Sequence, residues 1–336
     1  MSRPARIPLP TRDGVSASTV ATPCGPWRLT LDFLAERIPA VTRENWAQRM
    51  ARGEVLDAQG HPVPADAPFR AQTRLHYWRS LAFEHPVPFQ EDIVFQDEWL
   101  VVADKPHFLP VTPKGRYIQE TLLVRLKRRT GIDTLVPMHR IDRETAGLVV
   151  FTIQPHTRHA YQALLREHQI EKVYEAIAPW RPDLPWPLRR QSRLQESAAH
   201  FMAMQEVPGE PNADTLIEPI ELLSRAPGEP AHWARYQLTP RTGQKHQLRA
   251  HLCALGMSIA NDQIYPELRP ALAAHEAPDF SQPLQLLARS LRFTDPITGE
   301  QREFHSRRRL SLDAITPDAN LGPRQTAPAP RHLDGA

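Results

Sequence analysis

The sequence predicts an α+β protein built from short strands and flanking helices, and three observations lead to that prediction. The chain has 336 residues, of which 41% are hydrophobic, so it can bury a sizeable core in one large domain or two. Short apolar runs bounded by turn residues, at 93–95, at 99–103 and before Phe151, are typical of strands. Leucines at three- and four-residue spacing predict a helix over 120–130, with Gly131 as its end.

Changes in composition divide the chain into five expected segments. These are a loosely ordered arm over 1–27, a small N-terminal domain over 28–82, a linker over 83–90, a large domain over 91–312 and a polar, proline-rich, disordered tail over 313–336. In the small domain we predict two short helices, followed by a hairpin that turns at Gln59-Gly60. Thr42 is the expected N-cap of the second helix, and Gly53 is its expected end.

The composition limits the classes of function. The 41 lysine and arginine residues include only five lysines, so 36 are arginines. Arginine pairs with phosphate and stacks on bases, which favours a nucleic-acid partner; a GC-rich genome produces the same bias equally well. The two cysteines, far apart in sequence, fit a reducing compartment and exclude a cysteine zinc cluster. No stretch is apolar enough to span a bilayer and no secretory signal is visible, so we expect a cytoplasmic protein.

One charged cluster stands directly before a strand-like apolar run. Asp142 lies between Arg140 and Arg143, and the apolar run that follows ends at Phe151. Nearby cations favour the charged form of a carboxylate, so we expect Asp142 to be ionised at neutral pH. An ionised carboxylate at a strand end is a candidate nucleophile or general base. From these residues alone, a surface aspartate in a salt-bridged loop is the commoner interpretation.

The stretch from His139 to Leu148 resembles the His-Arg-Leu-Asp-x-x-Thr-Ser-Gly-Leu signature of RluA-type RNA pseudouridine synthases. Three further stretches match that family in the right order: two strand-like runs that end in Asp104-Lys105-Pro106, the segment Lys172-Val173-Tyr174-Glu175-Ala176, and the motif from Arg241 to His251. Residues 256–265 and 284–299 are also similar. The resemblance covers roughly residues 91–310, with departures at His107-Phe108, Gln244 and Ala288-Arg289.

The resemblance implies a fold. Members of this family have a mixed, mostly antiparallel sheet with flanking helices and a central RNA-binding cleft. Many carry a small ribosomal-protein-like RNA-binding domain ahead of it, which the two helices and the hairpin resemble. In that case Arg43, Arg49 and Arg52 would contact phosphate; a plain helical prefix is the alternative. The reaction isomerises uridine to pseudouridine without redox change, so no cofactor and no metal are expected.

The resemblance also implies roles for individual residues. Asp142 is the expected catalytic residue, Tyr174 stacks on the target base and assists proton transfer, and Arg249 pairs with Asp142. Arg140 fills the space that the flipped uridine leaves. The remaining expected RNA contacts come from Lys172, Arg241, Lys245 and His246. The expected partner is ribosomal or transfer RNA, and the expected oligomeric state is a monomer.

Several alternatives stay open at this point. The chain could be a non-catalytic RNA-binding or ribosome-assembly factor on the same fold. A hydrolase that uses Asp142 with His139 lacks a nucleophile elbow and is disfavoured. The cations at the end of the 120–130 helix fit a phosphate-binding edge, or simply the helix dipole. The tryptophans and arginines of 180–215 suit single-stranded RNA, but equally suit a packed, solvated loop.

Overall fold

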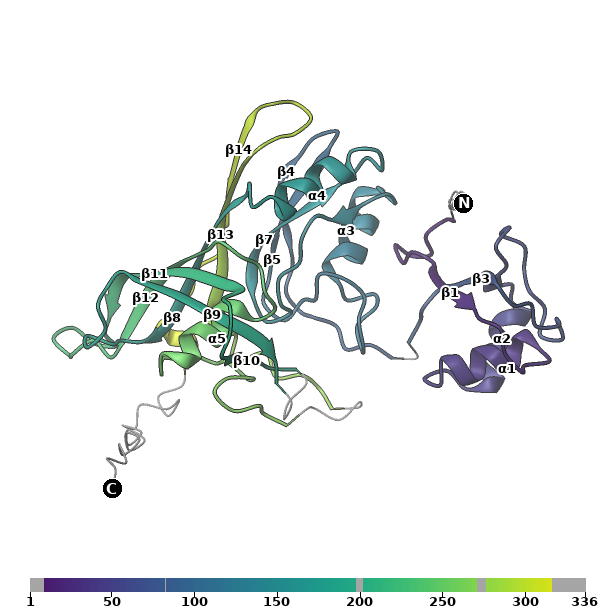
Figure 1. The fold of residues 1–336 in the computed structure, drawn as a ribbon, viewed down its shortest axis with the longest axis horizontal. Helices are drawn as coiled ribbons and strands as arrows, with labels where there is room; N and C mark the ends of the chain where they lie inside the picture. The colour runs from purple at the N-terminus through teal and green to yellow at the C-terminus, as the bar shows by residue number, and fades with distance from the viewer. Residues whose placement is uncertain (1–8, 82, 198–201, 271–275, 316–336) are drawn as a thin grey trace, which may run out of the picture. The chain divides into compact units, whose positions relative to one another are not determined.

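The computed structural model describes residues 9–81, 83–197, 202–270 and 276–315 (Figure 1). The chain divides into two compact units. The first comprises Met1–Gln169, Leu272–Pro278 and Thr294–Phe304, and the second comprises Ile170–Ala271, Asp279–Phe293 and His305–Ala336. Among the described residues, no helix has the length and apolarity needed to cross a membrane.

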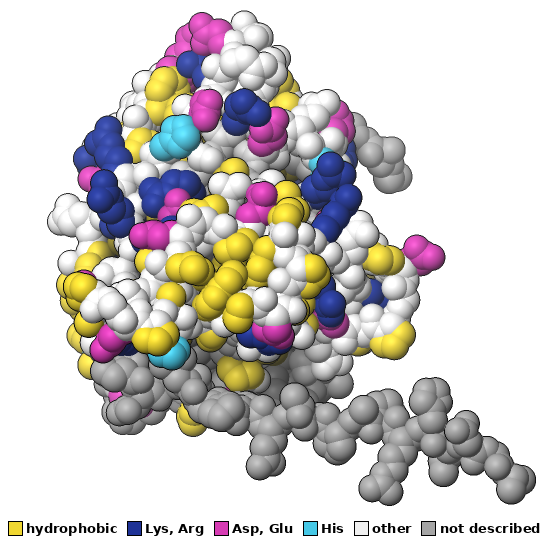
Figure 2. All heavy atoms as spheres, turned by 90° about the vertical axis from the view of Figure 1, so that its left-hand side faces the viewer, with side chains coloured by type: hydrophobic (Ala, Val, Ile, Leu, Met, Phe, Trp, Pro, Cys, Tyr) yellow, Lys and Arg dark blue, Asp and Glu magenta, His cyan; other side chains and the backbone are white. Residues whose placement is uncertain are grey.

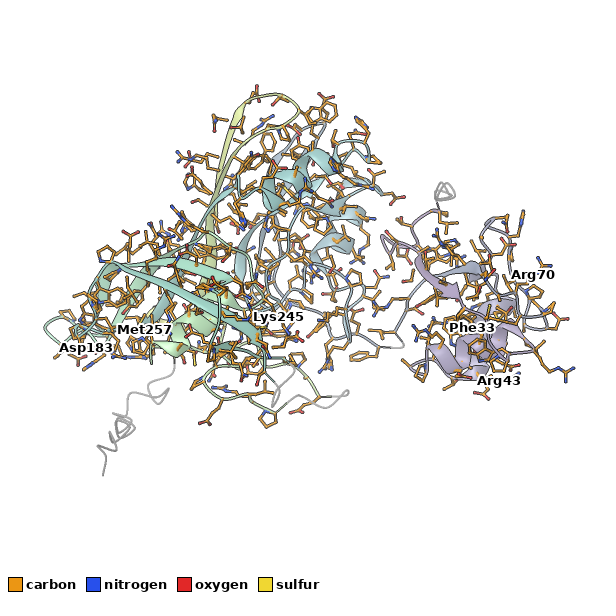
Figure 3. The ribbon with its side chains drawn as sticks, viewed as in Figure 1. Phe33, Arg43, Arg70, Asp183, Lys245 and Met257 are labelled. Carbon is orange, nitrogen blue, oxygen red and sulfur yellow. The ribbon has the colours of Figure 1, made fainter. Side chains whose placement is uncertain are left out.

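The first unit begins with the small N-terminal domain. Its elements are β1 (Ser18–Thr22), α1 (Thr30–Arg37), α2 (Arg43–Ala51), β2 (Val55–Leu56) and β3 (Thr73–Tyr77), with the three strands ordered β1-β3-β2. Phe33, labelled in Figure 3, and Trp46 are fully buried in its core. The structure has the local features that the sequence indicates here. Thr42 Oγ1 accepts a hydrogen bond from the Asn45 amide and caps α2, and Gly53 follows that helix with φ of 66°.

The structure corrects the expectation of a loosely ordered arm for part of residues 1–27. Ser18–Thr22 pairs antiparallel with β3 along its whole length. Val15 is buried against Ile118 and Val124 farther along the first unit. The arm is therefore ordered from residue 9 onward, because its β-prone and apolar side chains find partners distant in sequence. Residues 1–8 of the expected arm lie outside the described residues.

The rest of the first unit is a small antiparallel sheet with helices. Its elements are β4 (Asp92–Gln96), β5 (Leu100–Lys105), α3 (Leu122–Thr130), β6 (Val136–Pro137), β7 (Ala146–Thr152) and α4 (Arg158–Arg166). Strand β5 pairs with both β4 and β7, and every residue of β5 and β7 is buried. The apolar runs at 99–103 and before Phe151 therefore are strands, as the sequence predicts. Helix α3 ends at Gly131, which has φ of 71°.

The basic side chains at the end of α3 hold the arm and the linker. Lys127 Nζ donates to Ser16 Oγ at 2.8 Å. Arg125 donates to the carbonyl oxygens of Val87 and Phe89, at 2.7 Å each, and Arg129 donates to the carbonyl oxygen of Glu91. The basic side chains of α3 are therefore engaged with other groups of the first unit. Their contacts support neither a phosphate-binding edge nor a role that is limited to the interaction with the helix dipole.

The second unit contains a six-stranded antiparallel sheet in the order β10-β9-β11-β12-β8-β13. Its strands are β8 (Glu171–Pro179), β9 (Leu188–Glu196), β10 (Met204–Val207), β11 (Ala213–Leu223), β12 (Trp233–Pro240) and β13 (Leu286–Thr294), with helix α5 (Gln247–Ala254) between the last two. Strand β14 (Gln301–His305) follows β13 in sequence. The predicted α+β class with a mostly antiparallel sheet is confirmed.

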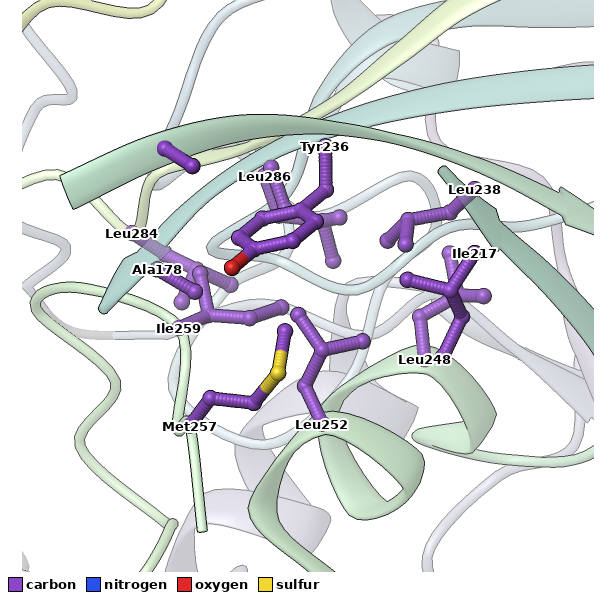
Figure 4. Packing of buried hydrophobic residues seen from close by; sticks show 12 residues of the cluster. Ala178, Ile217, Tyr236, Leu238, Leu248, Leu252, Met257, Ile259, Leu284 and Leu286 are labelled. Atoms are coloured by element: carbon purple, nitrogen blue, oxygen red, sulfur yellow. The ribbon is translucent and has the colours of Figure 1, made fainter. Parts of the chain in front are cut away.

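A hydrophobic cluster packs α5 against this sheet. Tyr236 and Leu238 point from β12 towards Leu248 and Leu252 of α5, with Met257 closing the cluster (Figure 4). All five side chains are buried. This packing fixes which face of α5 is turned to the sheet and therefore where its polar side chains lie.

The described residues of the 180–215 stretch, 180–197 and 202–215, form a packed region, and its tryptophans are not open base-binding rings. Trp180 and Trp186 stack with ring centroids 6.2 Å apart, and Trp186 contacts Tyr236 of the core. Arg189 pairs with Asp214, and Arg190 pairs with Glu206. The packed, solvated loop is therefore the better description of this stretch.

The boundary of the expected tail is wrong by a few residues. A short 3₁₀ helix spans Leu312–Ala314, and Ile315 is 1% exposed. Asn261 Nδ2 donates to the Ala314 carbonyl oxygen at 2.7 Å, which ties this segment to the second unit. The apolar side chain of Ile315 is buried, although the residues around it in the sequence are mostly polar and predict an exposed segment. Residues 316–336 lie outside the described part of the chain.

Candidate active site

The loop between β6 and β7 carries Asp142. Its ends are fixed by a hydrogen bond from the Met138 amide to the Val150 carbonyl oxygen at 2.8 Å and by a turn in which the Thr145 amide donates to the Asp142 carbonyl oxygen. His139 Nε2 accepts from the Val150 amide at 3.3 Å. That lone pair is therefore engaged with the backbone, which argues against His139 as the base of a hydrolase. Asp142 itself is partly exposed.

Two residues of the preceding motif hold this loop in place. Lys105 is fully buried, and its Nζ donates to the carbonyl oxygens of Pro106 and Arg143 at 2.9 Å each. The Nδ1–H group of His107 donates to the Glu144 carbonyl oxygen at 2.7 Å. The loop is thus anchored at the two residues that directly follow Asp142. Sequence reasoning used Lys105 only as part of a motif and gave it no function.

The two arginines beside Asp142 behave differently. Arg143 donates to the Glu144 carboxylate at 2.7 Å and to the Tyr117 hydroxyl at 3.4 Å. Arg140 is exposed, and no described residue forms a hydrogen bond or ion pair with it. Arg143 is thus engaged with Glu144 and Tyr117, and the expectation that nearby cations keep Asp142 ionised stays a prediction.

In the second unit, β8 carries Lys172 and Tyr174. Tyr174 lies opposite Leu238 of β12 and Ala288 of β13, and it packs against the hydrophobic core. Lys172 is partly buried, and this burial lowers its pKa. Its Nζ lies 3.9 Å from the point that a Cβ would occupy on Gly243. Among the described residues, no carboxylate pairs with Lys172.

Gln247 fixes the turn that precedes α5. Its Oε1 accepts from the Thr242 hydroxyl at 2.7 Å and from the Gln244 amide at 3.1 Å. Its Nε2 donates to the Asp214 carbonyl oxygen and to Thr215 Oγ1 on β11. The side chain is buried, and both ends of its amide are used. Gln247 lies inside the motif that the sequence singled out, but its part in shaping the turn is visible only in the structure.

The remaining predicted RNA contacts lie on or beside this turn. Arg241 and Lys245 are exposed, and Lys245 pairs with Glu196 at 3.1 Å. His246 stands just before α5 with φ of 52°, in the left-handed conformation. Its ring meets the Tyr265 ring edge-on, with centroids 5.9 Å apart. Lys245 is labelled in Figure 3.

Arg249 is buried in the second unit and paired with a carboxylate that sequence reasoning missed. Its Nε donates to Asp262 Oδ2 at 2.8 Å, and its Nη2 donates to Asp262 Oδ1 at 2.6 Å. The two side chains are 1% and 0% exposed. Asp262 Oδ1 also accepts from the amides of Ile264 and Tyr265. Two of the five guanidinium donors serve Asp262, so a pairing with Asp142 would use the others and stays a prediction.

His251 has a structural role. It is fully buried, with Nδ1 3.0 Å from Thr215 Oγ1 and Nε2 3.1 Å from Ser192 Oγ. Burial lowers its pKa to about 4, so the ring is neutral at pH 7. No group of three or more potential metal ligands occurs among the described residues.

The arginines expected to contact phosphate in the N-terminal domain are engaged within it. Arg43 pairs with Asp32 at 2.9 Å, and Arg52 pairs with Glu54 at 2.8 Å. Arg49 donates to Ser80 Oγ at 2.8 Å. These contacts give no support to the three arginines as a phosphate-binding set.

The site residues thus fall into two groups. Arg140 and Asp142 share one anchored loop of the first unit. In the second unit, Lys172 lies beside the 241–246 turn. Arg249 is paired with Asp262, and its guanidinium lies over the Tyr265 ring. One face of the molecule, shown in Figure 2, gathers hydrophobic side chains, with charges of both signs interspersed around them. That face is therefore not a continuous basic surface.

Comparisons with known proteins identify the family. A model of the RNA pseudouridylate synthase family matches residues 99–254. An uncharacterised RNA pseudouridine synthase of Synechocystis is 30% identical over 247 residues, which cover 70% of this chain and 78% of that protein. The tRNA pseudouridine synthase C of Vibrio cholerae is 33% identical over 217 residues, or 62% and 86% of the two chains. Another match is named for the large ribosomal subunit.

A solved structure supports the fold. The human protein RNA Pseudouridylate Synthase Domain Containing 1 superposes with a TM-score of 0.51 and 20% identity, over 65% of this chain and 83% of that one. At this identity the likeness concerns the fold alone. The family assignment depends on the sequence matches. The chain therefore belongs to the RNA pseudouridine synthases, of the RluA type after which two further relatives are named, and is an isomerase of that class.

Proposed function

We propose that the chain converts specific uridines to pseudouridine in structured ribosomal or transfer RNA, with Asp142 as the catalytic carboxylate. The observation that carries the proposal is the anchored loop. Lys105 and His107 hold the carbonyl groups of the two residues that follow a partly exposed Asp142, and Met138 and His139 before it are hydrogen-bonded to Val150. A reacting group must be held in position in this way, because misplacement of a reacting atom is costly in rate. Names of relatives refer to tRNA and to the large ribosomal subunit, which supports this choice of substrates.

The reaction has a simple balance of atoms. The bond from ribose C1′ to uracil N1 breaks, the base turns, and a new bond forms from C1′ to C5. The hydrogen on C5 leaves as a proton, and N1 gains one. Asp142 acts either by attack on the sugar or by assisting elimination, and Tyr174 lies against the base and assists the proton transfer at C5.

The second unit supplies electrostatic support in this proposal. Arg249 uses its donors beyond those held by Asp262 to pair with Asp142, which stabilises the charged carboxylate. Because two hydrogen bonds to Asp262 fix the orientation of the guanidinium, Arg249 is pre-organised for this contact.

RNA binding in this proposal uses cations at the two sites. The target base must leave its stack, which costs a few kcal/mol, and the exposed Arg140 fills the space. Lys172, Arg241, Lys245 and His246 contact the flanking backbone. Lys172 is the strongest candidate for a phosphate contact. Its ammonium group is partly buried and has no carboxylate partner among the described residues, so a phosphate would stabilise its charge most.

Release of tritium from C5 tests the proposal. Ribosomal and transfer RNA transcribed with tritium on uridine C5 is incubated with the intact chain, with Asp142→Asn and with Asp142→Glu. We expect tritium release with the intact chain only, while all three proteins bind the RNA with similar affinity. Release at the intact rate with Asp142→Asn would contradict the role of Asp142. No release with any protein, together with tight binding, would favour a non-catalytic RNA-binding factor.

A further inference from the structure

Four charged side chains of alternating sign form a row across four neighbouring strands of the second unit. Strands β11, β12, β8 and β13 are adjacent in this order, and they carry Glu221, Arg235, Glu175 and Arg289 respectively. Arg235 Nε donates to Glu221 at 2.8 Å, and its Nη1 donates to Glu175 at 3.4 Å. Arg289 donates to the same Glu175 carboxylate through Nε at 2.6 Å and through Nη2 at 2.9 Å. The reaction proposed above uses none of these four residues.

This row lies on the face of the sheet opposite to the Tyr174 side chain. Successive residues of a strand point to opposite faces, so Glu175 faces away from the side on which Tyr174 packs against the hydrophobic cluster. The pairing of β8 with β12 shows the same division. Tyr174 lies opposite Leu238, which is buried in that cluster, whereas Glu175 lies opposite Gln237. Any effect of the charged row on Tyr174 must therefore pass through the backbone of β8.

The backbone beside Tyr174 is irregular on its β13 side. Tyr174 pairs with Ala288, whereas the residue before it pairs with Ser290. Arg289 is therefore an extra residue that bulges out of β13. Bulges interrupt the pairing of strands, and they are frequent beside active sites, where they re-aim a side chain. At this bulge the guanidinium of Arg289 is bound to Glu175, the residue directly after Tyr174.

Arg289 is also bound to a third segment of the second unit. Its Nη1 donates to the carbonyl oxygens of Ser306 and Arg308 at 2.9 Å each, and the Ser306 amide donates to the Arg289 carbonyl oxygen at 2.8 Å. The side chains of Glu175 and Arg289 are only 14% and 22% exposed. A mostly buried ion pair is weak evidence for stability, and its better-attested use is to specify the register of the elements that it joins. The pair is therefore suited to fixing β8 against β13.

We propose that the ion pair of Glu175 and Arg289 is a positioning device for Tyr174. It holds β8 against the bulge of β13 and so fixes where the Tyr174 ring meets the target base. The inference deepens the proposed function and rests on it, because it takes Tyr174 to lie against that base. Displacement of a reacting group by about 1 Å can lower a rate by about a hundredfold. Because the pair itself does not touch RNA, it sets the turnover of the bound complex and leaves RNA affinity unchanged.

The test compares variants of the full chain at two ion pairs on the same two strands. The pair variants are Glu175→Gln and Arg289→Gln. The controls are Glu171→Gln and Arg292→Gln, because Glu171 and Arg292 also join β8 to β13 but are 67% and 54% exposed. Tritium release from uridine C5 is measured at saturating RNA, and the affinity for fluorescein-labelled RNA is measured by anisotropy. We expect release about tenfold or more slower in the pair variants, the intact rate in the controls, and equal RNA affinity throughout.

A spectroscopic measurement follows Tyr174 directly. The chain is labelled with 3-fluorotyrosine, and the fluorine resonance of Tyr174 is identified among those of the six tyrosines by its absence in Tyr174→Phe. We expect this resonance to shift or split in both pair variants and to stay in place in both controls. Tyr77 and Tyr161 lie in the first unit, so their unchanged resonances would show that the variants are folded. A Tyr174 resonance that stays in place in both pair variants would overturn the inference.

The two readouts separate this inference from the proposed function. Tritium release by the intact chain, with equal rates for pair variants and controls, would overturn the inference alone. So would a loss of RNA affinity in the pair variants with full release at saturating RNA. If the intact chain releases no tritium, the proposed function fails, and the Tyr174 resonance still decides whether the pair positions the ring.

Discussion

Replacement of Asp262 by asparagine should destabilise the second unit more than any comparable surface change. The carboxylate of Asp262 and the guanidinium of Arg249 form two hydrogen bonds, at 2.8 and 2.6 Å, and neither side chain is more than 1% exposed. Asparagine has nearly the same shape and keeps one oxygen for the amides of Ile264 and Tyr265. The change therefore removes the charge and one hydrogen bond while the packing stays.

The magnitude follows from the burial of the pair. Removal of one partner from a buried ion pair leaves an uncompensated charge and costs about 3–5 kcal/mol. Whatever pairing Arg249 has with a second carboxylate offsets part of that cost, so we expect about 3 kcal/mol. The matched control is Glu171→Gln, which breaks an exposed pair within the same unit: the side chains of Arg292 and Glu171 are 54% and 67% exposed. That change should cost about 0–1 kcal/mol.

Urea unfolding measures both changes. Trp180, Trp186 and Trp233 all lie in the second unit, and their fluorescence reports its unfolding in variants whose other four tryptophans are replaced by phenylalanine. Both substitutions are introduced into that background, and the free energy of unfolding is compared at an unchanged m-value. A loss for Asp262→Asn that lies within about 1 kcal/mol of the loss for Glu171→Gln would contradict this expectation, since burial would then not govern the strength of the pair.

Three further predictions follow from the described contacts. Burial lowers the pKa of His251 from 6.5 to about 4, so between these values the unfolded chain binds a proton that the folded chain does not. The free energy of unfolding should therefore fall by up to about 3 kcal/mol as the pH decreases over that range. His251→Gln should remove this pH dependence. Burial also lowers the pKa of Lys172, and a bound phosphate raises it. RNA affinity should therefore be full at low pH and be lost as the pH rises through the pKa that Lys172 has in the RNA complex. The Lys172→Arg variant should bind RNA independently of pH from 7 to 10.5. Arg289 donates to the carbonyl oxygens of Ser306 and Arg308 at 2.9 Å, so Arg289→Ala should speed tryptic cleavage after 307–309, whereas Arg292→Ala should not.

Local features of the fold could be predicted because their signals are local. The cap at Thr42 and the helix end at Gly131 depend on neighbours within four residues. The buried strand that ends near Phe151 is apolar throughout, so its burial is visible from composition alone. The sequence also shows that Ala288-Arg289 departs from the family's motif, but it does not show why. In the structure, Arg289 lies at a bulge in β13 and binds Glu175 and the segment after β14.

Features that depend on distant partners could not be predicted. Strand β1 is five residues long and pairs with β3 more than fifty residues later, so its own sequence resembles a loop. The partner of Arg249 is one of 38 acidic residues in the chain, and only packing selects Asp262. The conformation of His246 is set by the turn that Gln247 holds, and helical periodicity extends across both residues without distinguishing them.

Pseudouridine mapping of total RNA from source cells with and without the gene shows directly whether the chain modifies uridine. We expect one or a few uridines in ribosomal or transfer RNA to lose the modification in the deletion. The intact chain should restore it, and Asp142→Asn expressed at the same level should not. An unchanged map in the deletion, or full restoration by Asp142→Asn, would contradict the account.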